Sequence, residues 1–95
     1  MNTHILKSKT NHFQKLIDGN FFHAELRNNS DRNFQESDHI HFIEVDSRKQ
    51  ITGNVVKAQV HKIKANEGKE EIFPAGFVLI EFYVFEVIQK LNNEY

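Results

Sequence analysis

The sequence predicts a small α+β domain, mainly β, in which about five strands form a closed or nearly closed barrel and one short helix lies near the N-terminus. Three observations support this class. Short segments of alternating apolar and polar residues recur along the chain between polar turns. One helical stripe of apolar residues occurs close to the start. No repeat, linker or low-complexity tract divides the 95 residues, so we expect a single domain over residues 1–95.

The composition is that of an ordinary globular domain without a general preference for anions. Twelve basic and thirteen acidic residues leave a net charge of -1. A protein dedicated to duplex DNA usually has a clear basic excess, so the charge argues against that class. Recognition of one nucleotide or one exposed base needs only a local basic pocket and stays open. Nine Phe and no Trp indicate a phenylalanine-rich core.

The absence of Cys restricts both the chemistry and the compartment. Disulfides and thiolate metal sites are excluded, which fits residence in the cytoplasm. The N-terminus lacks the apolar run of a signal peptide. Residues 76–88 are apolar but contain Glu81 and Glu86, and they are shorter than the roughly twenty residues of a membrane-spanning helix. We therefore expect a cytoplasmic protein without a membrane partner, a metal or a cofactor.

The first two elements are predicted from periodicity. Residues 3–9 form a strand that ends near Ser8. A short helix follows, because apolar residues recur at helical spacing. Its apolar stripe consists of Phe13, Leu16 and Ile17. Asn11, with Gln14 three residues later, predicts a capping box at the helix start, and Gly19 suits the left-handed position that ends a helix.

Residues 21–27 alternate imperfectly and predict a strand with one apolar and one polar face. The apolar set comprises Phe22, Ala24 and Leu26. The opposite set comprises Phe21, His23, Glu25 and Arg27. Residues 28–33 are a turn by composition.

Three further strands complete the predicted barrel. Residues 39–45 and 54–64 alternate in polarity and predict one strand each. Polar loops follow them, at residues 46–53 and 65–76. Residues 77–88 are nearly continuous in apolar character. Such a run indicates a strand buried on both faces, at the centre of the sheet or barrel.

Glu25 and Arg27 are the central candidates for a binding site, since they lie two residues apart on one strand face. An arginine presents a planar fork that matches a phosphate or a base edge. A carboxylate can accept from the exocyclic amine of a base. The candidates for a stacking platform are Phe21 and Phe34. The alternative is structural: the pair would form a cross-strand salt bridge that fixes the hairpin, with Asp31 and Arg32 as the reciprocal pair.

Six histidines raise the question of a metal site or a general base. His39 and His41 share one strand face, and other histidines could converge with them. Those other histidines are His4, His12, His23 and His61. Catalytic zinc needs three protein ligands and an open position, and the sequence has no His-x-x-x-His pair on a helix, so we predict no metal ligands. His23 is the candidate general base, with Glu25 or Glu44 as its partner.

The order of motifs along the chain carries a family resemblance. The motifs begin with His4-Ile5-Leu6-Lys7, Phe13, Ile17 and Gly19. They continue with Glu25-Leu26-Arg27, Asn29, Asp31-Arg32, Phe34 and Asp38, and they end with Glu44, Asp46 and Thr52-Gly53. In this order the chain resembles the small bacterial and phage PUA-like domains of the ASCH superfamily.

The resemblance implies a pseudo-barrel of five or six strands, with the helix plugging one side and a cleft near the helix and the Glu-x-Arg strand. PUA-like domains commonly bind RNA, often through modified or flipped nucleotides. Some ASCH members are similar to small amidohydrolases that remove an acyl group from a modified cytidine, using a Lys and a Thr shortly after the helix-ending glycine. Here the residues after Gly19 are Asn-Phe-Phe-His-Ala, so that Lys and Thr are missing and a lysine-based hydrolase is not expected.

The sequence therefore predicts an RNA- or nucleotide-binding module without catalysis. The recognition pair would be Glu25 and Arg27, the phosphate contacts Lys7 and Arg32, and the stacking group Phe21 or Phe34. The first alternative is a small amidohydrolase on an acylated cytidine, with His23 or another base in place of the lysine. The second is a protein-interaction or self-associating regulatory domain, in which a homodimer uses exposed aromatic residues of the last strand. Those residues are Phe82, Tyr83 and Phe85.

Overall fold

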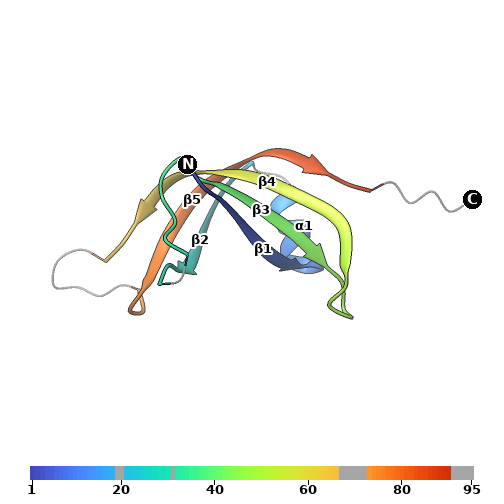
Figure 1. Ribbon diagram of the computed structural model, residues 1–95, viewed down its shortest axis with the longest axis horizontal. Coiled ribbons are helices and arrows are strands. Elements are labelled where there is room, and N and C mark those ends of the chain that lie inside the picture. Colours follow the sequence, from blue (N-terminus) through green and yellow to red (C-terminus); the bar gives the residue numbers. More distant parts are fainter. Residues whose placement is uncertain (19–20, 31, 67–72, 91–95) are drawn as a thin grey trace, which may run out of the picture.

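The computed structural model describes residues 1–18, 21–30, 32–66 and 73–90. Within these ranges the elements are β1 (Thr3–Lys9), α1 (Thr10–Ile17), β2 (Phe22–Asn28), β3 (His39–Val45), β4 (Ile51–Lys64) and β5 (Phe77–Ile88). The strands form one sheet in the order β1-β3-β4-β5-β2, which curls into a half-barrel (Figure 1). The predicted class, mainly β with a short helix near the N-terminus, is confirmed. In the same ranges no helix is long and apolar enough to cross a bilayer.

β1 and β2 form the two edges of the sheet, although only α1 separates them along the chain. β1 pairs with β3 in parallel, whereas the other three strand pairs are antiparallel. α1 packs against β1, β3 and β4. Register shifts in the β3–β4 and β4–β5 pairs increase the local bend of the sheet. The edge strands β1 and β2 flank the concave side of the sheet, and α1 lies on that side (Figure 1). All three elements come from the first part of the chain.

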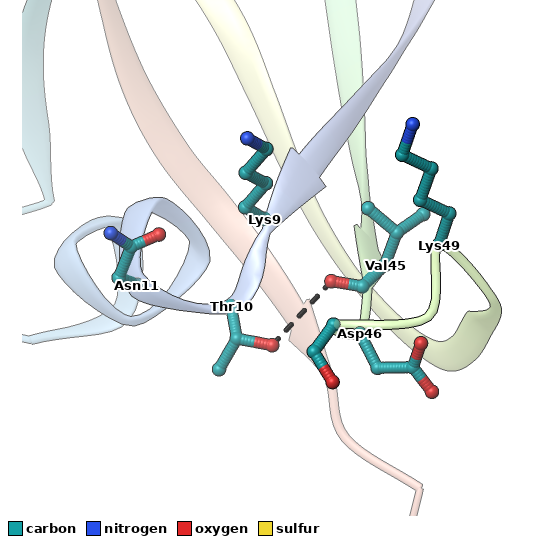
Figure 2. A pocket seen from close by; sticks show the side chains of 7 residues that line it. Lys9, Thr10, Asn11, Val45, Asp46 and Lys49 are labelled. Carbon is teal, nitrogen blue, oxygen red and sulfur yellow. Dashed lines mark hydrogen bonds between the residues drawn. The ribbon is translucent and has the colours of Figure 1, made fainter.

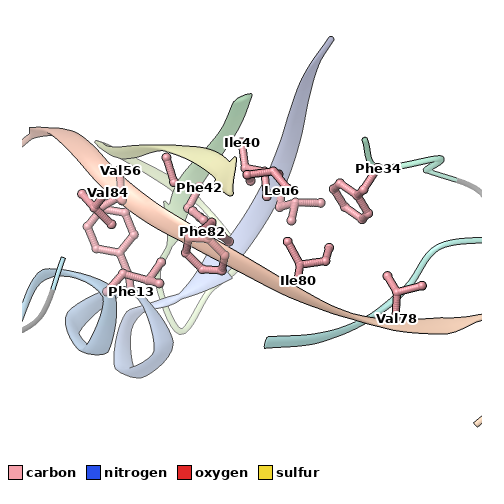
Figure 3. Packing of buried hydrophobic residues seen from close by; sticks show 13 residues of the cluster. Leu6, Phe13, Phe34, Ile40, Phe42, Val56, Val78, Ile80, Phe82 and Val84 are labelled. Carbon is pink, nitrogen blue, oxygen red and sulfur yellow. The ribbon is translucent and has the colours of Figure 1, made fainter. Parts of the chain in front are cut away.

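The core fills the space between the concave face of the sheet and α1. Phe13 and Leu16 are fully buried there, and Ile17 packs against the same cluster, as the helical stripe predicts. Alternate residues of the strands pack against them from the concave face of the sheet (Figure 3). The strand residues of this cluster include Leu6, Ile40, Phe42, Val56, Val60, Ile80, Phe82 and Val84. The predicted alternation of the third and fourth strands is thereby confirmed.

β5 is neither buried on both faces nor central, and both predictions were wrong. Phe82 and Val84 are buried, but Tyr83 and Phe85 are exposed. β4 occupies the centre of the sheet, and β5 lies between β4 and the edge strand β2. The difference arises because α1 covers only the concave face. On the convex face Phe85 of β5 packs against His39 of β3, with 5.0 Å between the ring centroids, and no helix of the described residues covers the pair.

β2 presents its polar side chains to the concave side and its apolar side chains to solvent, the reverse of an ordinary half-buried strand. Glu25 lies opposite Ile80 in the antiparallel register with β5, and Arg27 follows on the same face. Directly opposed residues share a face, so both polar side chains join the face on which Ile80 is buried. Phe22 and Leu26 point outward and are 49% and 43% exposed. A polar pair on the inner face needs hydrogen-bonding partners.

α1 begins directly at the end of β1, and its N-cap residue lies two residues before the predicted one. Lys9 is the N-cap residue and makes no side-chain capping hydrogen bond. Asn11 lies in the first turn, where its Oδ1 accepts from the backbone N–H of His12 at 3.0 Å. The capping-box prediction is wrong because β1 stays paired with β3 through Lys9, which sets the point where the chain turns into the helix. Gly19, the predicted C-terminal cap, lies outside the described residues.

A buried polar pair fastens the segment between β2 and β3 onto β1. His4 Nε2 lies 2.8 Å from Asp38 Oδ2. The backbone N–H groups of Asn2 and Gln35 each donate to the same carboxylate at 3.0 Å. Burial alone would raise the pKa of Asp38, but these hydrogen bonds lower it below the ordinary value of 3.8. Phe34 is buried beside the pair, with its ring centroid 4.4 Å from that of His4.

Candidate functional site

Three charged or titratable side chains from α1 and β2 meet on the concave side of the sheet. His12 Nε2 lies 2.6 Å from Glu25 Oε2. Arg27 donates to the other carboxylate oxygen, with Nε at 3.0 Å and Nη2 at 2.7 Å from Glu25 Oε1. Glu25 therefore holds an imidazole on one oxygen and a guanidinium on the other.

Ser8 extends this network to β1, because its Oγ is hydrogen-bonded to His12 Nδ1. Ser8 belongs to the inward-facing set of β1 and is buried. His12 follows four residues later, in the first turn of α1, so the direct β1–α1 junction brings the two side chains together. We call Ser8, His12, Glu25 and Arg27 the concave cluster.

The concave cluster is partly open to solvent. The exposed fraction of the side chain is 33% for His12, 31% for Arg27 and 19% for Glu25. Phe42 of β3 lies against the cluster, with its ring centroid 6.0 Å from Arg27 Cζ and 5.8 Å from the His12 ring centroid. A guanidinium near an aromatic face is electrostatically favourable, so Phe42 helps to hold the arginine in place.

Hydrogen-bond accounting identifies Arg27 as the member of the cluster that can bind a ligand. Both ring nitrogens of His12 are engaged, by Ser8 and Glu25, and both oxygens of Glu25 are engaged as well. A guanidinium has five N–H donors, of which Glu25 takes two. The remaining donors have no protein partner in the part of the chain that the structure describes. They form a planar edge that suits a phosphate or a carboxylate.

Of the predicted binding residues, the structure brings Glu25 and Arg27 together and places the others elsewhere. Lys7 belongs to the outward-facing set of β1. Phe21 is 70% exposed just before β2. Arg32 donates from Nη1 to a backbone carbonyl of β1 at 3.3 Å, so it lies at the opposite edge of the sheet.

Two expectations about this site need correction. Phe34 cannot stack on a ligand, because its ring is buried in the core. Glu25 and Arg27 also pair along one strand and not across the hairpin, so the predicted cross-strand bridge is absent from the described residues. Of the predicted reciprocal pair, Arg32 donates to a β1 carbonyl, and Asp31 lies outside the described residues.

His23, the predicted general base, forms no hydrogen bond or ion pair with Glu25 or Glu44 in the part of the chain that the structure describes. Its ring stacks on Phe82 with a centroid distance of 5.6 Å, and its buried Nε2 has no hydrogen-bond partner among the described residues. His12 occupies the position beside the carboxylate instead. The sequence feature that could have identified His12 is its position on the helix. His12 lies beside the buried stripe that contains Phe13, so it is directed toward the same side of the sheet.

Glu44 is a second buried acid on the concave side, next to Ser8 in the β1–β3 register. Its Oε1 accepts from Thr52 Oγ1 at 2.8 Å and from Asn54 Nδ2 at 2.9 Å. Burial would raise the pKa of Glu44, but these hydrogen bonds and one from Thr10 lower it below the ordinary value of 4.5. The ionised carboxylate therefore anchors the first residues of β4.

The histidines do not assemble a metal centre within the described ranges, where no three His, Cys, Asp or Glu side chains are placed to hold an ion. His41 lies opposite Lys57 in the β3–β4 register. Burial lowers the pKa of His41 below its ordinary value of 6.5, and the charge of Lys57 lowers it further. His39 packs against Phe85 on the same face.

A cavity of about 710 Å³ lies where β1 turns into α1 and β3 turns toward β4 (Figure 2). Its lining residues are Lys9, Thr10, Asn11, Val45, Asp46, Ser47 and Lys49. No predicted site residue lines it. Neither Lys9 nor Lys49 forms an ion pair with another described residue, and Asp46 Oδ1 accepts from two backbone N–H groups of its own turn. We place the candidate site at the concave cluster, because its charged groups are held by direct hydrogen bonds.

Fold and site together define a small, mainly β domain with a partly exposed polar cluster on its concave side. The chain belongs to the DUF3850 family, a domain of unknown function, whose family model matches residues 3–82. The match runs from β1 into β5 and includes every residue of the concave cluster. No curated protein matches the chain.

Proposed function

We propose that this protein binds RNA or a nucleotide through Arg27 and does not catalyse a reaction on it. One observation carries the proposal. Arg27 is fixed by two hydrogen bonds to Glu25, yet its side chain is 31% exposed and its remaining donors have no partner among the described residues. A guanidinium held in this way loses little conformational entropy when it binds an anion, so it is prepared for a phosphate.

The resemblance to PUA-like domains of the ASCH superfamily supports RNA or a nucleotide as the source of the anion. Those domains commonly bind RNA, and the curled sheet with one early helix suits a fold of that kind. The net charge of -1 fits a ligand recognised through few phosphates. In this proposal Glu25 acts as a positioning residue for Arg27 and not as an acceptor for a base.

The burial of Ser8 favours binding over catalysis. In a serine–histidine–carboxylate chain the histidine removes the hydroxyl proton and the serine oxygen attacks the substrate. Ser8 is 2% exposed, so a substrate has little access to its hydroxyl. A small amidohydrolase acting on an acylated cytidine stays the second candidate, because Ser8, His12 and Glu25 form a continuous hydrogen-bonded chain. In that case His12 would take the role first assigned to His23.

The proposal is tested by titrating the amide NMR spectrum with short single-stranded RNA and with free nucleotides. We expect shifts at residues 25–27 and at His12, and we expect Arg27→Ala to abolish them. Arg48→Ala is the matched control, because Arg48 is an exposed arginine in the β3–β4 turn. Unchanged spectra at millimolar nucleotide would overturn the proposal.

The hydrolase candidate has its own test. Acylated cytidine is incubated with the protein at high concentration, and free acid is measured over a range of pH. Turnover that disappears in His12→Gln would replace the binding proposal by the enzyme. Absence of product would leave binding as the function.

We further propose that the protein acts in the cytoplasm, for which the lack of Cys in the sequence is the support. Fusion to a fluorescent protein and cell fractionation would test this location.

A further inference from the structure

β2 leaves one hydrogen-bonding edge of the sheet open. The N–H of Val84 donates to the carbonyl of Phe21 at 2.7 Å, and the N–H of Asn29 donates to that of Gly76 at 2.8 Å. Both pairs belong to the antiparallel register between β2 and β5. Hydrogen-bonded pairs alternate with non-bonded pairs along such a ladder, so the odd-numbered residues of β2 bond to β5. The even-numbered residues turn their N–H and C=O groups to the open edge: Phe22, Ala24 and Leu26.

The two edges of the sheet differ in how they are protected. At β1, Arg32 donates to the carbonyl of Ile5, and α1 packs against the strand. At β2, the outward N–H and C=O groups of residues 22–26 have no backbone partner in the described ranges. β2 also contains no Lys and no Pro, which commonly protect an edge strand from pairing. The β2 edge is therefore competent to pair with another strand.

Residues 22–26 read Phe-His-Ala-Glu-Leu and are self-complementary about Ala24. Two antiparallel copies with a twofold axis at Ala24 place Phe22 opposite Leu26 of the second copy on the convex face. On the concave face the same axis places His23 opposite Glu25 of the second copy. An axis at Glu25 would instead oppose two carboxylates, which is unfavourable. Charge and the small side chain of Ala24 thus favour the axis at Ala24 over the axis at Glu25.

We propose that a second copy of this chain docks on the β2 edge and that the two β2 strands join antiparallel about Ala24 into one continuous sheet. The interface consists of one strand pair and its flanking side chains, so the dimer is weak and forms only as the concentration rises. Both concave clusters then lie on the same face of the joined sheet. This assembly does not depend on the proposed ligand.

Sedimentation velocity over a range of concentrations tests the dimer with two matched variants. Ala24→Lys places a second lysine directly opposite the first at the twofold axis, on an exposed position that leaves the β2–β5 ladder intact. Ile51→Lys adds the same charge at an exposed site at the start of β4. We expect wild type and Ile51→Lys to approach twice the monomer mass, and Ala24→Lys to stay monomeric with an unchanged circular dichroism spectrum. A wild type that stays monomeric throughout would overturn the proposal.

Cross-linking tests the register, because the natural chain has no Cys. Ala24→Cys treated with a short bis-maleimide should give a covalent dimer, whereas Ile51→Cys should stay monomeric. Equal cross-linking of both variants would contradict the docking at β2. A dimer that survives Ala24→Lys but is dispersed by Phe85→Lys would assign the interface to the convex face of β5, and would likewise overturn the proposal.

Discussion

The sheet carries two histidine–carboxylate pairs, which differ more in solvent exposure than in the distance between the two side chains. His4 and Asp38 are 2.8 Å apart, with side chains 8% and 2% exposed. His12 and Glu25 are 2.6 Å apart, with side chains 33% and 19% exposed. Backbone N–H groups complete the first pair, whereas an exposed arginine completes the second.

The comparison separates a structural pair from a candidate site. Asp38 has every interaction inside the protein, so removing it leaves buried groups without partners. Glu25 interacts with His12 and with Arg27, and the Arg27 side chain is partly exposed, with further donors that have no partner among the described residues. We therefore expect changes at the first pair to appear in stability and changes at the second pair to appear in binding.

The largest expected effect is at Asp38. Asp38→Ala leaves a buried histidine and two backbone N–H groups without their acceptor, which should lower the free energy of unfolding by about 3 kcal/mol or more. Urea unfolding followed by circular dichroism measures this change. Glu36→Ala, an exposed acid in the same segment, should change it by less than about 0.5 kcal/mol. A loss below about 1 kcal/mol for Asp38→Ala would contradict the structural role.

Acid should weaken the fold in two stages. The pKa of His41 is lowered from 6.5, so the unfolded chain takes up a proton first and stability begins to fall below that pH. The pKa values of Asp38 and Glu44 are lowered from 3.8 and 4.5, so their contribution is present above those values and is lost as the pH falls through the lowered ones. Unfolding curves from pH 8 to pH 3 measure both stages. His41→Gln should remove the first stage and keep the second; a flat profile would contradict the assignment.

Glu25→Gln should show most clearly that the His12–Glu25 pair affects binding more than stability, in contrast to the His4–Asp38 pair. The cluster is partly exposed, so the free energy of unfolding should fall by no more than about 1 kcal/mol. An amide cannot hold the imidazole and the guanidinium as a carboxylate does. Affinity for a nucleotide or short RNA should therefore fall about tenfold, which corresponds to about 1.4 kcal/mol. Calorimetric titration measures the affinity, and an unchanged value would remove Glu25 from its positioning role.

The smallest effect on stability is expected from Arg27→Lys. The charge is kept, so the free energy of unfolding should change by less than about 0.5 kcal/mol. Lysine has no planar fork, so binding should still weaken. Arg48→Lys, in the exposed β3–β4 turn, should leave both quantities unchanged. Equal affinity of Arg27→Lys and wild type would show that only the charge matters at this position.

Periodicity in the sequence predicts most elements here, but not which way β2 faces. The strands and the helical stripe follow from alternation and from the spacing of Phe13 and Leu16. Alternation separates an apolar from a polar face of β2 and would ordinarily bury the apolar face, which is the reverse of the observed orientation. Its orientation comes from the register with β5, in which Glu25 lies opposite Ile80, far away in sequence.

The same limitation applies to the candidate site. Glu25 and Arg27 were found because they share a strand face, and the pairing between them is local. His12 was missed as the partner of Glu25, because the contact requires α1 to cross the concave side and β2 to join the far edge. His23 shares the strand face of Glu25, but its ring stacks on Phe82, which lies directly opposite in the β2–β5 register.

The strand order also bears on how the chain acquires this cluster during synthesis. β3, β4 and β5 pair with their neighbours in sequence, so this meander can form as one unit, and β1 and β2 then add to its two flanks. The pairing of β2 with β5 closes a loop of about fifty residues, which is entropically costly and therefore slow. A nascent chain that has not yet emerged through β5 already contains Ser8, His12, Glu25 and Arg27. It lacks β5, the strand that places Glu25 and Arg27 of β2 next to Ser8 and His12. We therefore expect the cluster to be among the last parts of the molecule to assemble.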